Sequence, residues 1–243
     1  MFDFSAERTV QSVEESLKRL GLEYIDIIQI HDMEFAPSLD IIINETLPAL
    51  QKLKDTGKVK FIGITGYPLE NFRTVLERSK TNIDTLLTYC RCSLNDTGLL
   101  DYMEFFKEHG VGVVNASPIS MGLLSNRGPP SWHPAEESVR NKCKQAVDYC
   151  QVQGVDISKL ALHFTLEIED IPTTLVSTAS IQNLQKNIDA VGQKLTDAES
   201  NCLQYIIDNI FKPSGNLSWE GVEVTRYWQK MKQLELAHPV AMS

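Results

Sequence analysis

The chain has 243 residues, of which 42% are hydrophobic and 23% are charged, proportions typical of a globular protein with a sizeable core. Its formal net charge of −9 and pI near 5.1 argue against nucleic acid as a main partner, because phosphate binding needs a basic surface. No apolar run approaches the roughly 20 residues of a membrane-spanning helix, and no secretory signal is visible, so we expect a cytoplasmic protein without a membrane partner.

Strands and helices are predicted to alternate along the chain. In order, the pattern predicts a helix over residues 5–20, a strand over 24–30, a helix over 39–56, a strand over 60–67, a helix over 69–79, a strand over 84–89, a helix over 97–109 and a strand over 110–118. A loop over 122–134 then precedes helices over 135–153 and 157–167, a strand over 173–180, and helices over 182–191 and 196–209.

Three local signals refine these elements. Ser5 and Thr196 are expected to cap their helices, and Pro48 is expected to kink or break the helix over 39–56. Gly57 is suited to ending that helix. Residues 212–243 are expected to form a C-terminal loop and tail, with a short helix over 227–236 and disorder over 237–243.

The cysteines do not indicate a disulfide framework or a metal site. Their number is odd, their spacing is irregular and no CxxC motif occurs: Cys90, Cys92, Cys143, Cys150 and Cys202. We expect all five to be reduced thiols that fill the core or the surface. No other metal-ligand spacing stands out, so no metal is expected.

The predicted strands are short and continuously apolar, which is typical of a parallel sheet that is buried on both faces. Strands that alternate with helices at this spacing indicate βα units, and both a doubly wound sheet and a (β/α)8 barrel fit them. Neither GxGxxG nor GxxxxGK[ST] occurs, so a Rossmann or P-loop protein would lack its phosphate-binding turn.

Polar residues follow the predicted strands, at the carboxyl ends where parallel βα folds bind ligands. They are His31 and Asp32, residues 65–67, Tyr89 and Cys90, residues 115–118 and residues 177–180. Small hydroxyls, one imidazole and one amide suit a pocket for a polyhydroxylated or phosphorylated small molecule.

Four stretches give the chain a family resemblance: SVEESLKRLGLEYIDIIQIHD (12–32), TLPALQKLKDTGKVKFIGITGYPLENF (46–72), GVGVVNASPISMGLL with GPPSWHP after it (110–134), and LVSTASIQNLQKNIDAV (175–191). With these motifs the chain resembles the aldo-keto reductases, and most closely their L-galactose dehydrogenase type. The resemblance implies a (β/α)8 TIM-type barrel that holds an extended nicotinamide dinucleotide without a Rossmann turn.

The resemblance gives His31 a catalytic role. It places this residue where the family keeps an active-site histidine, whose neutral imidazole would donate a hydrogen bond to the substrate oxygen during hydride transfer. The alternative is a histidine that merely ends a strand. Asp32 would orient His31, bind a sugar hydroxyl, or be a solvated carboxylate without a role.

The cofactor-binding residues follow from the same resemblance. Thr65 and Gly66 match a serine–asparagine pair that holds the nicotinamide carboxamide, and Gly66 lacks the side chain of that asparagine. Ser117 and the loop containing Ile119, Gly122 and Leu124 match the segment around the pyrophosphate, although Gly122 would also suit a simple tight turn. A last group matches the segment around the adenosine: Thr178, Ser180, Asn183 and Asn187.

The cofactor is expected to be NAD, with NADP as the alternative. NADP-dependent relatives often carry Lys or Arg near the 2′-phosphate, because a dianionic phosphate is best bound by cations. This chain has Ala179 and Ser180 there.

The resemblance begins partway through the family pattern, so we expect residues 1–211 to form a barrel lacking about its first three βα units. Those units carry the aspartate, tyrosine and lysine of the family's active site. One hypothesis is therefore a fragment or splice form of an aldose dehydrogenase that, when full-length, oxidises a sugar such as L-galactose to its lactone. The others are a catalytically inactive protein that binds nucleotide or a partner, and a chain that closes by self-association through its open sheet edges.

Overall fold

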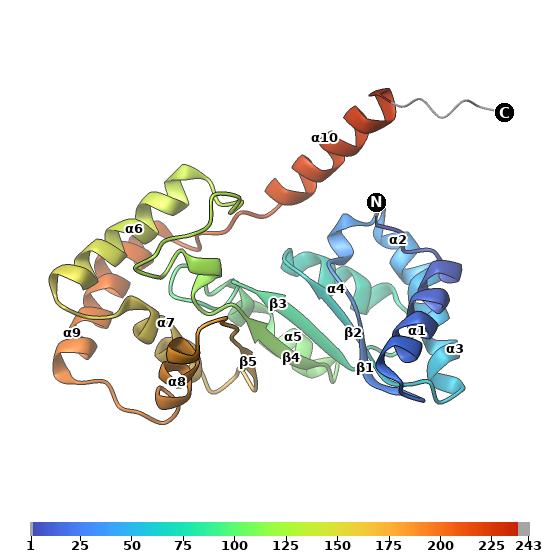
Figure 1. Ribbon diagram of the computed structural model, residues 1–243, viewed down its shortest axis with the longest axis horizontal. Coiled ribbons are helices and arrows are strands. Elements are labelled where there is room, and N and C mark those ends of the chain that lie inside the picture. Colours follow the sequence, from blue (N-terminus) through green and yellow to red (C-terminus); the bar gives the residue numbers. More distant parts are fainter. Residues whose placement is uncertain (1, 238–243) are drawn as a thin grey trace. The chain divides into compact units, whose positions relative to one another are not determined.

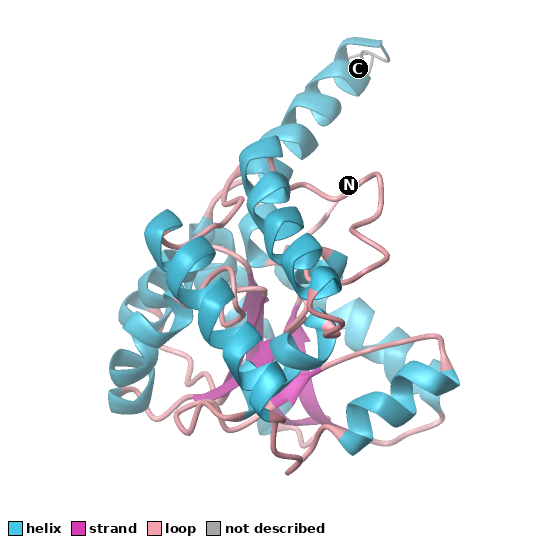
Figure 2. Cartoon of the chain, turned by 90° about the vertical axis from the view of Figure 1, so that its left-hand side faces the viewer, coloured by secondary structure: helices cyan, strands magenta, loops and turns pink. Residues whose placement is uncertain are grey.

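The computed structural model describes residues 2–237, and its chain divides into two compact units. The first unit contains Met1–Leu86 and Glu220–Ser243, and the second contains Leu87–Trp219. Helices make up most of the regular structure of both units (Figure 2). No helix among the described residues is both long and apolar enough to cross a membrane.

The first unit is built on a parallel pair of strands. β1 (Ile25–Ile30) pairs with β2 (Val59–Gly66) in a register that runs from Ile25 opposite Val59 to Ile30 opposite Ile64. The chain between them forms the short α2 (Leu39–Ile41) and α3 (Leu47–Asp55), so the unit contains the expected βα connection. α1 (Ala6–Leu20) packs against α3, and α4 (Leu69–Arg78) follows β2 (Figure 1).

The core of the first unit is mainly aliphatic, with the buried rings of Phe72 and Tyr67. Ile62 and Ile64 of β2 and Phe72 of α4 are fully buried, as are Ile42 and Leu47 from the segment between β1 and β2. Burial of this face supplies most of the driving force for packing the helices on the strands.

The helix expected to kink or break at Pro48 is irregular just before it, although its backbone stays helical from Ile41 to Leu47. Residues Ile42–Thr46 form a π-helical turn between α2 and α3, and Pro48 occupies the first turn of α3. Proline has no N–H to donate and its ring clashes with the preceding turn, so a regular α-helix cannot continue through it. α3 ends at Asp55 with Thr56 as its C-cap, and Gly57 follows in the left-handed conformation that suits glycine after a helix.

The second unit also contains parallel strands. β3 (Thr85–Tyr89) begins at its border, and the N–H of Cys90 after it donates to the carbonyl of Ala116 at the end of β4 (Gly112–Ala116). β4 pairs in parallel with β5 (Thr174–Leu175). Helices α5 (Met103–Glu108), α6 (Glu137–Val152), α7 (Ile157–Leu166), α8 (Ile181–Asp189) and α9 (Asp197–Ile206) complete the unit (Figure 1).

Three element predictions were wrong in extent. The strand over 173–180 has only two residues. It pairs with Asn115 and Ala116, and because β4 ends at Ala116 the pairing does not extend further. The helix over 97–109 is a 3₁₀ segment, Gly98–Tyr102, followed by the short α5. The tail helix α10 (Val222–Ala237) is longer than 227–236, and residues 238–243 of the predicted disordered end lie outside the described part of the chain.

The predicted helix caps are confirmed. The Ser5 hydroxyl accepts a hydrogen bond from the Arg8 N–H, and Thr196 forms a reciprocal capping box with Glu199. All five cysteines are free and buried, as expected for thiols that fill a core.

Candidate functional site

The first group of predicted site residues lies together at the carboxyl ends of β1 and β2. Because Ile30 is opposite Ile64 in the parallel register, His31 and Thr65 leave their strands at the same edge. The N–H of Asp32 donates to the Thr65 hydroxyl oxygen over 2.8 Å, which ties the two strand ends to each other. The structure therefore brings His31, Asp32, Thr65 and Gly66 together.

The His31 imidazole is accessible and has a carboxylate beside it. Its side chain is 79% exposed, and its Nδ1 lies 3.1 Å from Oδ2 of Asp32, whose side chain is 20% exposed. Burial raises the pKa of Asp32, while the neighbouring His31 lowers it. Asp32 adopts a left-handed backbone conformation, with φ 49°, which turns the chain sharply after His31.

Glu34 was not among the predicted site residues, and its carboxyl lies against Gly66 and Tyr67 at the end of β2. Its Oε1 accepts a hydrogen bond from the Tyr67 N–H over 2.9 Å, and its Oε2 is buried with no hydrogen-bond partner among the described residues. Burial is the largest cause that raises the pKa of Glu34 to about 7, and the charges of Asp32 and Glu223 raise it further against the opposing backbone hydrogen bonds.

The Glu34 carboxyl also lies against Gly66. Gly66 is not among the residues with positive φ, so its backbone does not require glycine. A Cβ at this position would lie 2.7 Å from Glu34 Oε2, closer than non-bonded atoms approach. The Glu34 carboxyl thus occupies the space in which a side chain at residue 66 would begin. Only the tertiary contact reveals this, because each residue taken alone is ordinary in a loop or strand end.

The second group of predicted site residues lies in the second unit, after β4. The N–H of Ser117 donates to the Leu175 carbonyl, which joins the loop to β5. Ile119 accepts hydrogen bonds at its carbonyl from the N–H groups of Gly122 and Leu124. The Leu124 side chain is fully buried, so it packs the base of the loop. Ser117, Ile119, Gly122 and Leu124 therefore share one compact turn.

Gly122 is required by its conformation and by its surroundings. Its φ is +100°, in the region that L-residues rarely adopt, and a Cβ would lie 3.1 Å from the Gly128 carbonyl oxygen. The turn therefore closes tightly against the segment at Gly128 and Pro129. Most backbone N–H groups of this turn already donate to carbonyls of the same unit, so hydrogen bonds within the protein close the turn.

The third group surrounds the start of α8 in the same unit. The Ser180 hydroxyl accepts from the Asn183 N–H over 3.3 Å as the cap of α8, and the Thr178 hydroxyl accepts from the Ser180 N–H. Asn183 is exposed and Asn187 is half-buried on the same helix. The hydroxyls thus have local structural partners, while the amides remain accessible.

Comparisons with known proteins identify the family of the chain. The aldo/keto reductase family model matches residues 1–208. L-galactose dehydrogenase from Arabidopsis thaliana is 45% identical over 219 residues, which cover 90% of this chain and 68% of that protein. D-arabinose 1-dehydrogenase from Saccharomyces cerevisiae is 31% identical over 233 residues, covering 90% of this chain and 69% of that protein.

The solved structures give the same result. The holo form of aldo-keto reductase AKR11C1 from Bacillus halodurans has a TM-score of 0.64 and 28% identity, covering 84% of this chain and 68% of that one. The expected resemblance is confirmed, both to the family and to its L-galactose dehydrogenase type.

Proposed function

Because the chain belongs to the aldo/keto reductase family, we propose that it binds a nicotinamide dinucleotide and that its fold serves hydride transfer between this cofactor and an aldose. The observation that supports the proposal best is the hydrogen bond from the Asp32 N–H to the Thr65 hydroxyl, which joins the end of β1, next to His31, to the end of β2. The resemblance assigns the Thr65 hydroxyl to the carboxamide and the turn at Gly122, which has no Cβ, to the pyrophosphate.

In this proposal, bound nicotinamide would supply or accept the hydride, and His31 forms a hydrogen bond with the substrate oxygen. The neutral imidazole donates a hydrogen bond from Nε2 to the substrate oxygen, and its Nδ1 lies 3.1 Å from Oδ2 of Asp32. Asp32 therefore orients His31.

NAD is favoured over NADP. The segment proposed to surround the adenosine contains one basic residue, Lys186, whose Nζ lies 3.6 Å from Oδ2 of Asp156. This pairing reduces the charge available for a 2′-phosphate, and a single lysine lacks the bidentate geometry of arginine.

The proposed substrate class is an aldose such as L-galactose, oxidised at its anomeric hydroxyl to a lactone in the cytoplasm. The similarity to two proteins named as sugar dehydrogenases supports this class. We further propose that residues 1–211 correspond to part of a (β/α)8 barrel. We also propose that the aspartate, tyrosine and lysine of the family's active site have no counterpart in this chain, which alone would then bind nucleotide with weak or no turnover and could self-associate through open strand edges.

Binding and turnover are tested separately. Calorimetric titration with NAD and NADP should give measurable affinity, tighter for NAD, and absorbance of NADH should show whether L-galactose or D-arabinose is oxidised. His31→Gln should abolish any turnover while leaving nucleotide affinity within about twofold, because His31 contacts the substrate oxygen in this proposal. His109→Gln, an exposed histidine at the end of α5, is the control. Failure to bind either nucleotide would refute the proposal.

A further inference from the structure

The loop after β4 holds an unusual backbone conformation. Three L-residues in it have positive φ: Ser117 at 58°, Ser120 at 49° and Met121 at 53°, and Gly122 follows at 100°. L-residues disfavour this region, and they stay there only when the surrounding structure fixes them. The contacts of Ser120, which is fully buried, show what fixes this turn.

Ser120 is held at both of its oxygen atoms. Its hydroxyl donates to Oδ1 of Asn95 over 2.5 Å and lies 3.0 Å from the hydroxyl of Ser93. On the other side, Nε2 of His133 lies 3.1 Å from the Ser120 carbonyl oxygen. Asn95, Ser93 and His133 are themselves buried, so water does not compete for these bonds.

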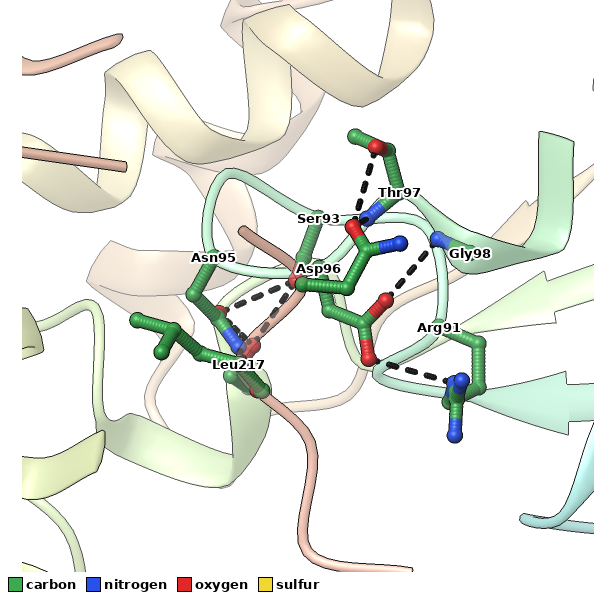
Figure 3. Close-up of polar contacts among 9 residues, drawn as sticks. Arg91, Ser93, Asn95, Asp96, Thr97, Gly98 and Leu217 are labelled. Carbon is green, nitrogen blue, oxygen red and sulfur yellow. Dashed lines mark hydrogen bonds and ion pairs between the residues drawn. The ribbon is translucent and has the colours of Figure 1, made fainter. Parts of the chain in front are cut away.

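A segment from far along the chain contacts both Asn95 and His133, the residues that bond to Ser120. Residues 216–219, here called the strap, follow the last helical turns of the second unit. Asn95 donates from Nδ2 to the backbone carbonyl of Leu217 over 3.0 Å (Figure 3). The backbone carbonyl of Asn95 accepts from the Leu217 N–H over 2.8 Å. Trp219 packs its ring edge-on to His133, with centroids 4.8 Å apart.

The loop that carries Asn95 is also rigid. Arg91 and Asp96 form an ion pair of 3.2 Å with side chains 8% and 0% exposed, and Asp96 accepts from the Gly98 N–H over 2.8 Å (Figure 3). The N–H and hydroxyl of Thr97 both donate to Oδ1 of Asn216 in the strap. Asn95 thus sits between a fixed loop, the strap and the turn at Ser120.

We propose that Asn95 is a positioning residue: with the strap, it holds residues 117–124 in the left-handed turn that receives the nucleotide's pyrophosphate. This inference rests on the proposed nucleotide binding for its ligand, but the hold on the loop is a property of the free protein. Asn95 does not touch the ligand. It acts by removing alternative loop conformations, which reduces the entropy lost on binding.

The hold is tested by amide hydrogen exchange in the free protein. The N–H groups of Ser120, Gly122, Leu123 and Leu124 bond within the loop and report its closure. Asn95→Ala and Ser120→Ala should each speed their exchange by roughly tenfold or more, while the amides of β4 and α6 keep their protection. Asn216→Ala, at an exposed position, should give a smaller effect. If Asn95→Ala fails to fold, the exchange rates of Ser120→Ala test whether the contact between Asn95 and Ser120 keeps the loop closed.

The control is Asn209→Ala. Asn209 also donates from Nδ2 to a backbone carbonyl, that of Tyr205, at an exposed place outside this network, so its loss should not change the loop. The inference is overturned if the loop amides exchange at the wild-type rate in Asn95→Ala, or if amides throughout the second unit speed up equally.

Nucleotide binding gives the second readout. Asn95→Ala should weaken NADH binding roughly tenfold, equivalent to about 1.4 kcal/mol, and Asn209→Ala should leave it unchanged. A looser loop with undiminished NADH affinity would overturn the positioning role. If the wild-type chain binds neither NADH nor NADPH, the proposed function fails, while the exchange measurement still decides whether Asn95 holds the loop.

Discussion

Replacing Glu34 by glutamine should remove a specific pH dependence from the stability of the first unit. Burial raises the pKa of this carboxyl from its ordinary value of 4.5 to about 7. Between these two values the folded chain keeps the Glu34 proton while the unfolded chain has lost it. The folded state then binds more protons, so the free energy of unfolding falls as pH rises from about 4.5 to about 7 and levels off above it.

The size of the effect follows from the same two values. A pKa displaced from 4.5 to about 7 corresponds to roughly 3 kcal/mol of stability lost across that interval. Glu34→Gln keeps an oxygen that can accept from the Tyr67 N–H but has no proton to lose. The variant should therefore gain stability relative to the wild type as pH rises, by roughly 3 kcal/mol between about pH 4.5 and about pH 7.5.

Urea unfolding of the wild type and of Glu34→Gln at half-unit pH steps measures the difference between their free energies of unfolding. The other titrating groups are the same in both proteins, so their contributions largely cancel. Glu77→Gln, at an exposed glutamate of α4 in the same unit, is the matched control and should follow the wild type. Parallel stability curves for the wild type and Glu34→Gln across this range would show that Glu34 is not the buried titrating group described above.

Three further variants test the packing by urea unfolding at neutral pH. Asp96→Ala leaves the Arg91 charge buried without its partner and should cost roughly 3 kcal/mol, whereas Asp148→Ala, which breaks an exposed ion pair on α6, should cost less than about 1 kcal/mol. Equal costs would contradict the role of burial. Phe72→Ala opens a cavity at a fully buried ring and should cost about 3–5 kcal/mol, visible also as a lower Tm. Thr196→Ala removes the capping box of α9 and should lower the free energy of unfolding by about 1 kcal/mol. An unchanged Tm would contradict a stabilising role of this cap.

The sequence by itself determined the order of strands and helices, the caps at Ser5 and Thr196, the irregular helical turn next to Pro48 and the placement of His31 at the end of a strand. These features depend on interactions within a few residues: side-chain periodicity, local hydrogen bonds and the missing N–H of proline. The family motifs are also contiguous in the chain, so the order of the amino acids is enough to identify them.

Only the tertiary structure decided what lies against Gly66 and what holds the turn at Ser120. The first depends on the Glu34 carboxyl, from a distant part of the chain, entering the space of a side chain. The second depends on Asn95, which lies 25 residues from Ser120 and 122 from Leu217. No local pattern encodes such contacts, because they exist only once the path of the folded chain has brought distant polar groups together and excluded water from them.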